Sequence, residues 1–382
     1  MIESIRTYCL RQALKEPFGF SQWYYQTRKA LLVEIVDHSG AVGWGECYGP
    51  AEVNQSAVDT LYAPLLIGWD PLRNEAAWQH GWRHSLDFAR RGVLMGALSG
   101  IDMALMDLKG RLLGVSVSEL MGGRVREEVP CYATGMYFRE QPEEVLMETI
   151  LGEAQAHWEG GFRALKIKIG KNPSFDRHLI DAMRETFPEA QLMADSNHGY
   201  SLSEAISMGR RLSEADYAWF EEPLHPDLVN QFRQLSDAVT VPIATGECEQ
   251  TRWGFQTLLE TGGVQVAQPD LAYCGGPSEG LKIRAIASSL GVSVVPHCWG
   301  TQLNLACTTH FNATTVVEPG RLEAAEPTLE LDRTENPLRD DMYAVPVDVD
   351  QGTARVPTGP GLGVEVDRKA MERFCVQETE CR

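Results

Sequence analysis

The second part of the chain repeats one pattern, in which a short apolar strand precedes an amphipathic helix at a nearly constant spacing. The strands of this pattern after Val129 are VPCYAT, RALKIKI, QLMAD, YAWFE, PIATGE, VQVAQPD and VSVVPH. Strands that alternate with helices form a parallel sheet whose faces are covered by those helices. Because the units are so many and so evenly spaced, they predict an α/β fold in which the sheet closes into a barrel.

The segments on either side of this pattern predict two further parts of the chain. Residues 1–126 contain β-rich runs followed by a long apolar helical stretch, which is typical of a small α+β domain. The tail has Pro and Gly turns and no further repeat of the pattern. We therefore expect a capping domain over residues 1–126, the barrel over 127–331, and a segment over 332–382 that returns to the capping domain.

The composition makes several kinds of partner improbable. The chain has 382 residues and a formal net charge of −19, without a basic cluster, so nucleic acid and anionic membrane surfaces are poor partners. The sequence contains no apolar run long enough to cross a membrane and no signal-peptide pattern at its start. Nine cysteines without a CxxC pair are typical of reduced thiols. We expect a cytoplasmic protein.

Acidic residues end three successive strands of the predicted barrel. Asp195, Glu221 and Glu247 follow one another at intervals of 26 residues. A single carboxylate at such a place is usually a helix cap or a surface charge, but the carboxyl ends of parallel strands meet on one face of a barrel. The three groups should therefore converge and repel one another unless a cation lies between them. Hard oxygen ligands suit Mg²⁺, or Mn²⁺ as a substitute, better than Zn²⁺.

Two groups that can move protons flank these carboxylates. Lys166 and Lys168 lie two residues apart and so share a face of their strand, where mutual repulsion should lower the pKa of each and free one as a base. Asp270 and His297 end the next two strands after Glu247, and the carboxylate should orient the imidazole as an acid–base pair. Bases on both sides of a metal ion predict abstraction of the proton α to a carboxylate.

Short motifs along nearly the whole chain resemble those of the mandelate racemase subgroup of the enolase superfamily. They are GWGE at 43–46, ALSGIDMALMDLKG at 97–110, KIKIG at 166–170, DSN at 195–197, FEEP at 220–223, GE at 246–247, QPD at 268–270, PH at 296–297 and GPGLGVE near the C-terminus. Each motif alone is weak, but the set in this order is specific. The resemblance implies a (β/α)7β modified TIM barrel with an α+β capping domain, and a homo-oligomer.

The resemblance also implies roles for the residues identified above. The three strand-end carboxylates correspond to magnesium ligands. Lys168, with Lys166 as its partner, corresponds to the base on one face of the substrate, and the His297–Asp270 pair corresponds to the base on the other. Which of the two bases removes the proton stays open.

Candidate substrate-binding residues follow the barrel strands or lie in loops of the capping domain. The last barrel strand of the subgroup carries a glutamate that contacts the substrate carboxylate, and here Glu330 is preferred to Glu326. The other candidates are Asn197, His198, Trp299, Tyr25 and Tyr48. For the aromatic residues of the capping loops, a role in packing is an equal alternative.

Within the subgroup, NHGY after Asp195, PHCWGT and EPTLELDRTENPLR resemble the group of bacterial D-galactarolactone cycloisomerases. This likeness implies a small anionic sugar acid or its lactone as substrate, with loss of the α-proton followed by β-elimination. Dehydratases of hexarates or hexonates expel hydroxide after the same abstraction, and racemases or epimerases of 2-hydroxy acids return the proton. A non-catalytic binding protein of this fold would lack a ligand or a base, and none is missing here.

Overall fold

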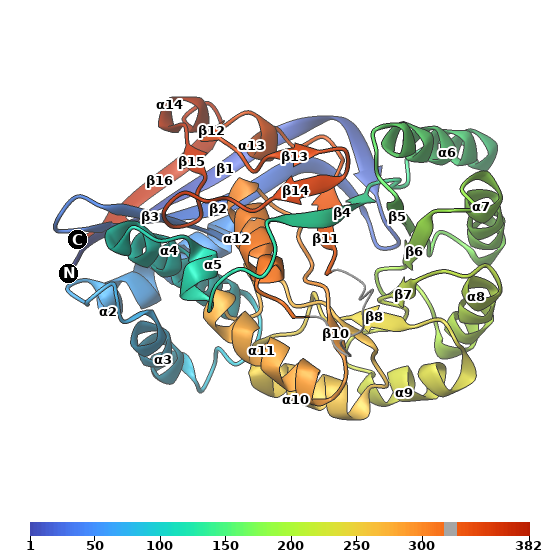
Figure 1. Ribbon diagram of the computed structural model, residues 1–382, viewed down its shortest axis with the longest axis horizontal. Coiled ribbons are helices and arrows are strands. Elements are labelled where there is room, and N and C mark those ends of the chain that lie inside the picture. The colour runs from blue at the N-terminus through green and yellow to red at the C-terminus, as the bar shows by residue number, and fades with distance from the viewer. Residues whose placement is uncertain (317–326) are drawn as a thin grey trace.

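The N-terminal part of the computed structural model is an antiparallel sheet packed against helices (Figure 1); the structure describes residues 1–316 and 327–382. The strands of this sheet, in spatial order, are β16 (Cys375–Cys381), β1 (Ile2–Gly19), β2 (Tyr24–Asp37) and β3 (Val42–Cys47). Its helices are α1 (Ala51–Ala57), the π-helix η1 (Val58–Tyr62), α2 (Ala63–Leu66), α3 (Asn74–Ser85), α4 (Val93–Leu113) and α5 (Val117–Leu120). The last strand of the chain therefore lies beside the first, and the two termini are neighbours.

Strand β2 is buried on both of its faces. Leu31, Val33 and Ile35 pack with the helices of the N-terminal part, whereas Leu32 points the other way into a core shared with the barrel. This division follows from the alternation of side chains along a strand. The sheet thus joins the two parts of the molecule through its own hydrophobic residues.

Helix α4 lies so close to β3 that only glycine fits at the contact. A Cβ atom on Gly45 would lie 2.0 Å from the carbonyl oxygen of Gly100, and one on Gly100 would lie 2.3 Å from the Cys47 sulfur. These distances are far below van der Waals contact, so the glycines of GWGE and ALSGID permit the close packing.

Eight strands and seven helices alternate through the described residues from β4 to β11. The strands are β4 (Glu128–Thr134), β5 (Ala164–Lys168), β6 (Gln191–Asp195), β7 (Trp219–Glu221), β8 (Ile243–Thr245), β9 (Val266–Ala267), β10 (Ser293–Val294) and β11 (Leu329–Asp332). The sheet order is β10-β9-β8-β7-β6-β5-β4, and β11 pairs in parallel with β4 on the other side. The predicted (β/α)7β barrel with its α+β capping domain is confirmed.

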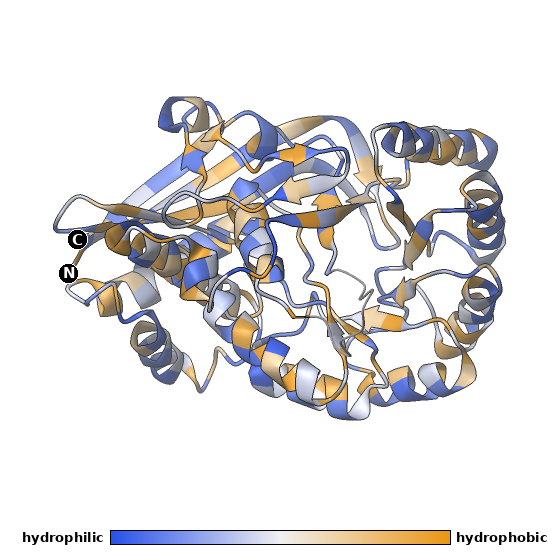
Figure 2. Cartoon of the chain, viewed as in Figure 1, coloured by the Kyte–Doolittle hydropathy of each residue, from blue (hydrophilic) through white to orange (hydrophobic). Residues whose placement is uncertain are grey.

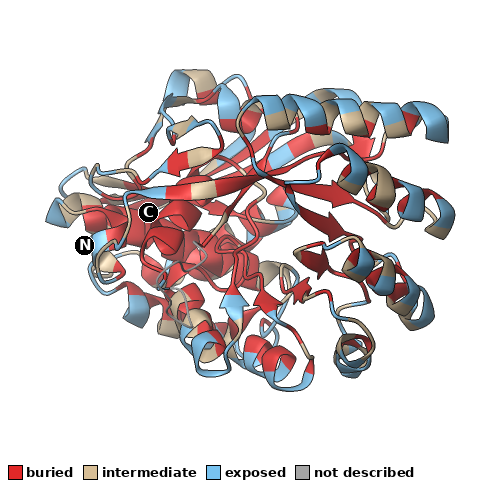
Figure 3. Ribbon diagram, turned by 45° about the vertical axis from the view of Figure 1, so that its right-hand side comes forward, coloured by how far each residue is buried: buried red, intermediate tan, exposed pale blue. Residues whose placement is uncertain are grey.

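The helices of the barrel cover the outside of these strands. They are α6 (Glu143–Glu159), α7 (Pro173–Thr186), α8 (Leu202–Glu214), α9 (Val229–Ala238), α10 (Thr251–Thr261), α11 (Pro277–Ser289) and α12 (Gln302–Ala313). Helix α8 shows why they form: Ser201 and Glu204 make a capping box, and Ala205, Met208 and Leu212 make a buried stripe at helical spacing. Hydrophobic and hydrophilic residues alternate around the outer helices (Figure 2), whose outer faces are exposed while the strands are buried (Figure 3).

Helix α12 differs from the other barrel helices because every one of its residues is buried. The capping domain covers it, and Glu46 of GWGE accepts hydrogen bonds at its N-terminus from the Thr301 amide (2.9 Å), the Thr301 hydroxyl (2.7 Å) and the Asn304 amide (3.2 Å). A carboxylate is favoured at a helix N-terminus. This contact holds the loop that follows His297 against the capping domain.

The segment after β11 packs against both parts of the molecule. Its elements are α13 (Pro337–Asp340), β12 (Tyr343–Val345), β13 (Val349–Asp350), β14 (Thr353–Arg355), β15 (Glu365–Val366), α14 (Arg368–Met371) and β16. Strand β14 pairs antiparallel with β4 of the barrel, and β16 pairs with β1. Among the described residues, no helix has the length and apolar character that crossing a bilayer requires.

Candidate active site

The three strand-end carboxylates converge at one end of the barrel. Asp195 and Glu221 end β6 and β7 and are direct partners in the sheet register, and Glu247 follows β8. One oxygen from each lies within 4.8 Å of the other two. Asp195 and Glu221 are fully buried, so their charges cannot be screened by water. The donor set consists of hard oxygens alone and fits Mg²⁺.

The two lysines of β5 contact these carboxylates. Lys166 pairs with Glu221 and, at 2.7 Å, with Glu330, and Lys168 pairs with Asp195. Burial lowers the pKa of Lys166, but Glu221 and Glu330 raise it further, to well above its ordinary value. Burial and the neighbouring Lys166 lower the pKa of Lys168, but Asp195, together with Tyr137 and Glu247, raises it by more, so the pKa lies above its ordinary value. The predicted lowering of the lysine pKa values is therefore wrong in this structure. The neighbouring carboxylates raise these pKa values by more than repulsion between the two lysines lowers them.

His297 and Asp270 form the expected pair at the other end of the site. His297 Nδ1 lies 2.6 Å from Asp270 Oδ2, while the second Asp270 oxygen accepts from the Ala272 amide (2.7 Å) and from Asn304 Nδ2 (3.2 Å). His297 Nε2 points to the triad, 3.6 Å from Glu247 Oε2. Burial lowers the pKa of His297, but Glu247 and Asp270 together raise it to about 10. Asp270 thus holds the imidazole with Nε2 facing the triad, where it can take up a proton.

The two candidate bases lie at opposite ends of the row of carboxylates. Lys168 contacts Asp195, whereas His297 lies beside Glu247. Four strands, β6 to β9, separate their strands in the sheet. A substrate bound over the row would therefore meet one base from each side.

A cavity of about 520 Å³ opens above the triad, between the barrel and the loops of the capping domain. Both bases and Glu247 line it, and so do the predicted substrate-binding residues Tyr25, Tyr48, Asn197, His198, Trp299 and Glu330. Tyr25 packs on Trp299 with ring centroids 5.0 Å apart, and Tyr48 packs edge-on against His297 at 5.5 Å. The aromatic residues of the capping loops therefore both pack and face the cavity. Glu326 lies outside the described residues.

Glu330 is fully buried on β11 and is held from three sides. It accepts hydrogen bonds from the Thr134 hydroxyl (2.7 Å) and from the Cys298 amide (3.0 Å), besides its ion pair with Lys166. Both of its oxygens already have partners in the protein. Its contact with a substrate carboxylate remains a prediction.

The sequence did not point to several residues that line the cavity. They are Phe20, Gln22, Tyr137, His225, Pro226 and Cys248. Tyr137 lies just after β4, and its ring centroid is 4.9 Å from Lys168 Nζ. The rule that strand ends face the active site applies equally to β4 and could have identified it.

The loops beyond β6 and β7 hold residues in strained backbone conformations. Asn197, His198 and Glu222 have φ values of +40°, +66° and +44°. Such values are unfavourable for residues other than glycine and persist where the surroundings impose them, often at functional sites. Here the His198 amide donates to the Glu222 carbonyl at 2.7 Å, which ties the two loops together.

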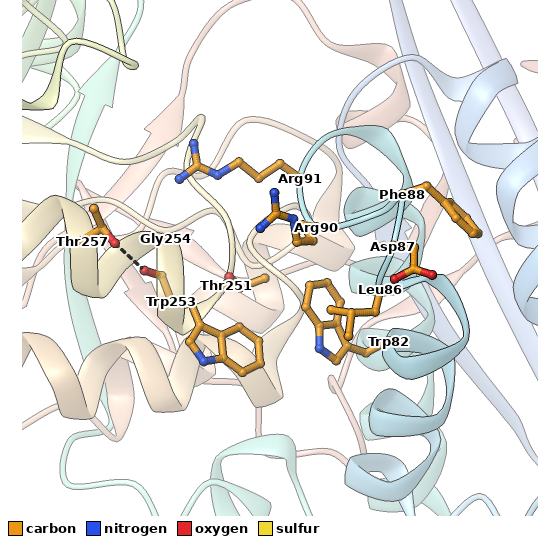
Figure 4. Close-up of a pocket in the computed structure, with 10 residues that line it drawn as sticks. All are labelled: Trp82, Leu86, Asp87, Phe88, Arg90, Arg91, Thr251, Trp253, Gly254 and Thr257. Carbon is orange, nitrogen blue, oxygen red and sulfur yellow. Dashed lines mark hydrogen bonds between the residues drawn. The ribbon is translucent and has the colours of Figure 1, made fainter.

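A second, larger cavity of about 840 Å³ lies between the segment before α4 and helix α10 (Figure 4). Trp82 and Trp253 stack across it with ring centroids 5.5 Å apart. It shares no lining residue with the cavity over the triad. It is therefore separate from the candidate active site.

Models of protein families match both parts of the chain. Residues 2–122 match the mandelate racemase / muconate lactonizing enzyme N-terminal domain, and residues 150–370 match the enolase C-terminal domain-like family. The chain belongs to the enolase superfamily. The predicted family membership is confirmed.

Characterised relatives of the chain act on sugar acids. The chain is 40% identical to D-galactarolactone cycloisomerase of Agrobacterium fabrum, over 98% of each protein. It is 38% identical to the structure of 3,6-anhydro-D-galactonate cycloisomerase from Zobellia galactanivorans, with a TM-score of 0.88 and coverage of 98% and 99%. A racemase structure from Streptomyces coelicolor with bound magnesium is 27% identical, with a TM-score of 0.87 and coverage of 98% and 100%. Sugar-acid dehydratases are also among the relatives, so the predicted lyase or isomerase class is confirmed.

Proposed function

We propose that this protein is a magnesium-dependent cycloisomerase of a cyclic sugar acid, such as a hexarate lactone. The observation that carries the proposal is the row of three converging carboxylates with a base at each end. The relatives named as cycloisomerases support the ring-opening reaction, since each acts on a sugar acid closed into a ring. The expected substrate has a carboxylate, a hydrogen on the α-carbon and the ring oxygen on the β-carbon.

Asp195, Glu221 and Glu247 would hold the magnesium ion. The ion, when bound, supplies positive charge that stabilises the negative charge developing on the substrate carboxylate as the α-proton leaves. Its charge would also compete with Lys168 for Asp195, which frees the lysine to face the substrate. The bound magnesium in a structural relative supports this choice of metal, with Mn²⁺ as a substitute.

The protein residues carry the proton transfers. Either His297 Nε2 or Lys168 Nζ removes the α-proton, and the electron pair of the broken C–H bond forms a double bond between the α- and β-carbons. The bond from the β-carbon to the ring oxygen breaks, and that oxygen leaves with its electron pair. When the α-carbon carries a hydroxyl, the resulting enol gains a proton at the β-carbon and loses its hydroxyl proton. The product is a linear 2-keto acid and an isomer of the substrate.

A substrate panel tests this proposal. Hexarates, hexonates and their lactones are each incubated with the Mg²⁺-loaded protein, and the 2-keto acid formed is measured. We expect the largest kcat/KM with a lactone or anhydro sugar acid. If only open-chain acids react, with loss of water, the protein is a dehydratase; if no 2-keto acid forms but the α-carbon is inverted, it is a racemase or epimerase.

We further propose a cytoplasmic homo-oligomer. All nine cysteines are free in the structure, which is typical of proteins in a reducing compartment. The oligomer is proposed from the family alone.

A further inference from the structure

A second cluster of metal-binding side chains lies beside the carboxylate triad. His198, Glu222 and Cys248 follow members of the triad in the chain by three residues, one and one. A donor atom from each lies within 4.8 Å of the other two. The proposed reaction uses neither Glu222 nor Cys248. We propose that these three residues form a second metal site, which takes a zinc-like transition-metal ion and not magnesium.

Two of the three distances between the donor atoms match the edges of a tetrahedron around such an ion. His198 Nε2 lies 3.6 Å from Cys248 Sγ and 3.2 Å from Glu222 Oε2. With Zn–S of about 2.3 Å and Zn–N or Zn–O of about 2.0–2.1 Å, a tetrahedral ion places nitrogen about 3.6 Å from sulfur and about 3.3 Å from oxygen. His198 Nε2 therefore already lies at the spacing that such an ion requires from each of the other two ligands.

The imidazole of His198 is already oriented for a metal. Its Nδ1 lies 3.2 Å from the carbonyl oxygen of Leu224, which can only accept a hydrogen bond, so Nδ1 carries the proton. In the neutral ring the lone pair is then on Nε2, which faces Glu222 and Cys248. Histidine ligands of metal ions commonly donate their other N–H to a backbone carbonyl in this way.

The Glu222 carboxylate gives a second, independent indication that a ligand binds at this cluster. Its side chain is 1% exposed, yet Oε1 has no hydrogen-bond partner among the described residues. A buried carboxylate oxygen without a partner costs free energy. A cation bound by both oxygens of the Glu222 carboxylate would give Oε1 a partner.

The chemistry of the donors selects the ion. Thiolate and imidazole favour zinc, cobalt or nickel, whereas magnesium prefers oxygen ligands. The carboxylate triad should therefore bind magnesium, and the neighbouring cluster should bind the transition-metal ion. Cys248 is exposed and lines the active-site cavity, which leaves a path of entry and an open position for water.

Occupation of this site should inhibit the enzyme, a consequence that rests on the proposed function. Asn197 Nδ2 donates to Glu222 Oε2 at 3.3 Å, and Asn197 Oδ1 accepts from Lys168 Nζ at 2.9 Å. An ion on Glu222 would therefore disturb the group that orients the base Lys168. Binding of the ion itself requires no catalytic activity.

Cobalt binding in the presence of saturating Mg²⁺ tests the site directly. Co²⁺ is titrated into the full-length wild type and into Cys248→Ser, His198→Gln, Glu247→Gln and the control Cys375→Ser, and thiolate-to-cobalt charge-transfer absorption is followed. Zn²⁺ affinity is measured in parallel by competition with a chromogenic chelator. Cys375 lies on β16, away from the cavity, and is partly exposed, which makes it a matched cysteine control.

We expect one equivalent of Co²⁺ with the charge-transfer band in the wild type, in Cys375→Ser and in Glu247→Gln. The band should be absent in Cys248→Ser. Zn²⁺ affinity should fall at least about tenfold in Cys248→Ser and in His198→Gln, because loss of even a residue that hydrogen-bonds a metal ligand commonly costs about tenfold or more. Absence of the band in the wild type, or binding that Glu247→Gln abolishes and Cys248→Ser leaves unchanged, would overturn the proposal. These readouts do not depend on turnover, so they are separate from a failure of the proposed function.

Discussion

The substitution Asp270→Asn tests how the acid–base pair works, because it removes a charge and keeps the shape of the side chain. One Asp270 oxygen accepts from two N–H groups, those of Ala272 and Asn304, and the other faces His297 Nδ1. An asparagine side chain has only one oxygen, and the Ala272 and Asn304 N–H groups keep that oxygen on their side. Its NH₂ group must therefore turn to His297, which forces Nδ1 to accept and places the imidazole proton on Nε2. The neutral ring then has no lone pair facing the substrate.

The expected loss follows from the role of the base. General acid–base catalysis contributes about 10²–10⁴-fold, so kcat should fall by that factor, or about 3–5 kcal/mol in the activation barrier. KM should change little, since Asp270 does not line the cavity. The assay is 2-keto acid formation at saturating Mg²⁺.

A matched control for this substitution is Asp176→Asn. Asp176 is also fully buried, but it lies on α7 and accepts a hydrogen bond from Tyr200 (2.7 Å) outside the active site. Its kcat should stay close to wild type. The reasoning is refuted if Asp270→Asn keeps kcat within about threefold of the wild-type value while the folded protein binds Mg²⁺ normally.

Three further outcomes follow from the account. EDTA should abolish activity and Mg²⁺ restore it, and Glu247→Gln should bind the ion far more weakly; full turnover in metal-free buffer would contradict the metal site. Light scattering should show a homo-oligomer of even subunit number, and a clean monomer near 42.4 kDa would refute it. Burial lowers the pKa of His310 to about 4, so between about pH 6.5 and 4 the unfolded chain takes up a proton that the folded one excludes. The contribution of His310 to folding stability should therefore fall as the pH is lowered across that window, by up to about 3 kcal/mol, so the difference in unfolding free energy between the wild type and His310→Gln should change by that amount in denaturant titrations; a difference that does not depend on pH would contradict the assignment.

The positions of the candidate catalytic residues could be predicted because a barrel constrains them strongly. A residue that ends a parallel strand must face the same end of the barrel as its neighbours, so Asp195 and Glu221 had to meet once their strands were recognised. The pairing of Asp270 with His297 follows from the same rule. For these residues the local pattern determines the place of the side chain.

Other features depend on contacts between distant parts of the chain and could not be predicted. The pKa of Lys166 depends on Glu330, which is 164 residues away in the chain and 2.7 Å away in space. Glu46 belongs to a motif that was recognised, yet its contact with the start of α12 has no local signature. Such contacts arise from packing of the whole fold.

The most direct test of the central claim is exchange of the substrate α-proton with solvent deuterium in Lys168→Ala and His297→Asn, each saturated with Mg²⁺. If the two bases face opposite sides of the substrate, one variant should lose α-exchange altogether, while the other keeps exchange and loses net product. His297 is the residue that we expect to start the reaction. The loss in rate should be about 10²–10⁴-fold for the base that starts the reaction. Near-wild-type turnover in both variants would contradict the proposed chemistry.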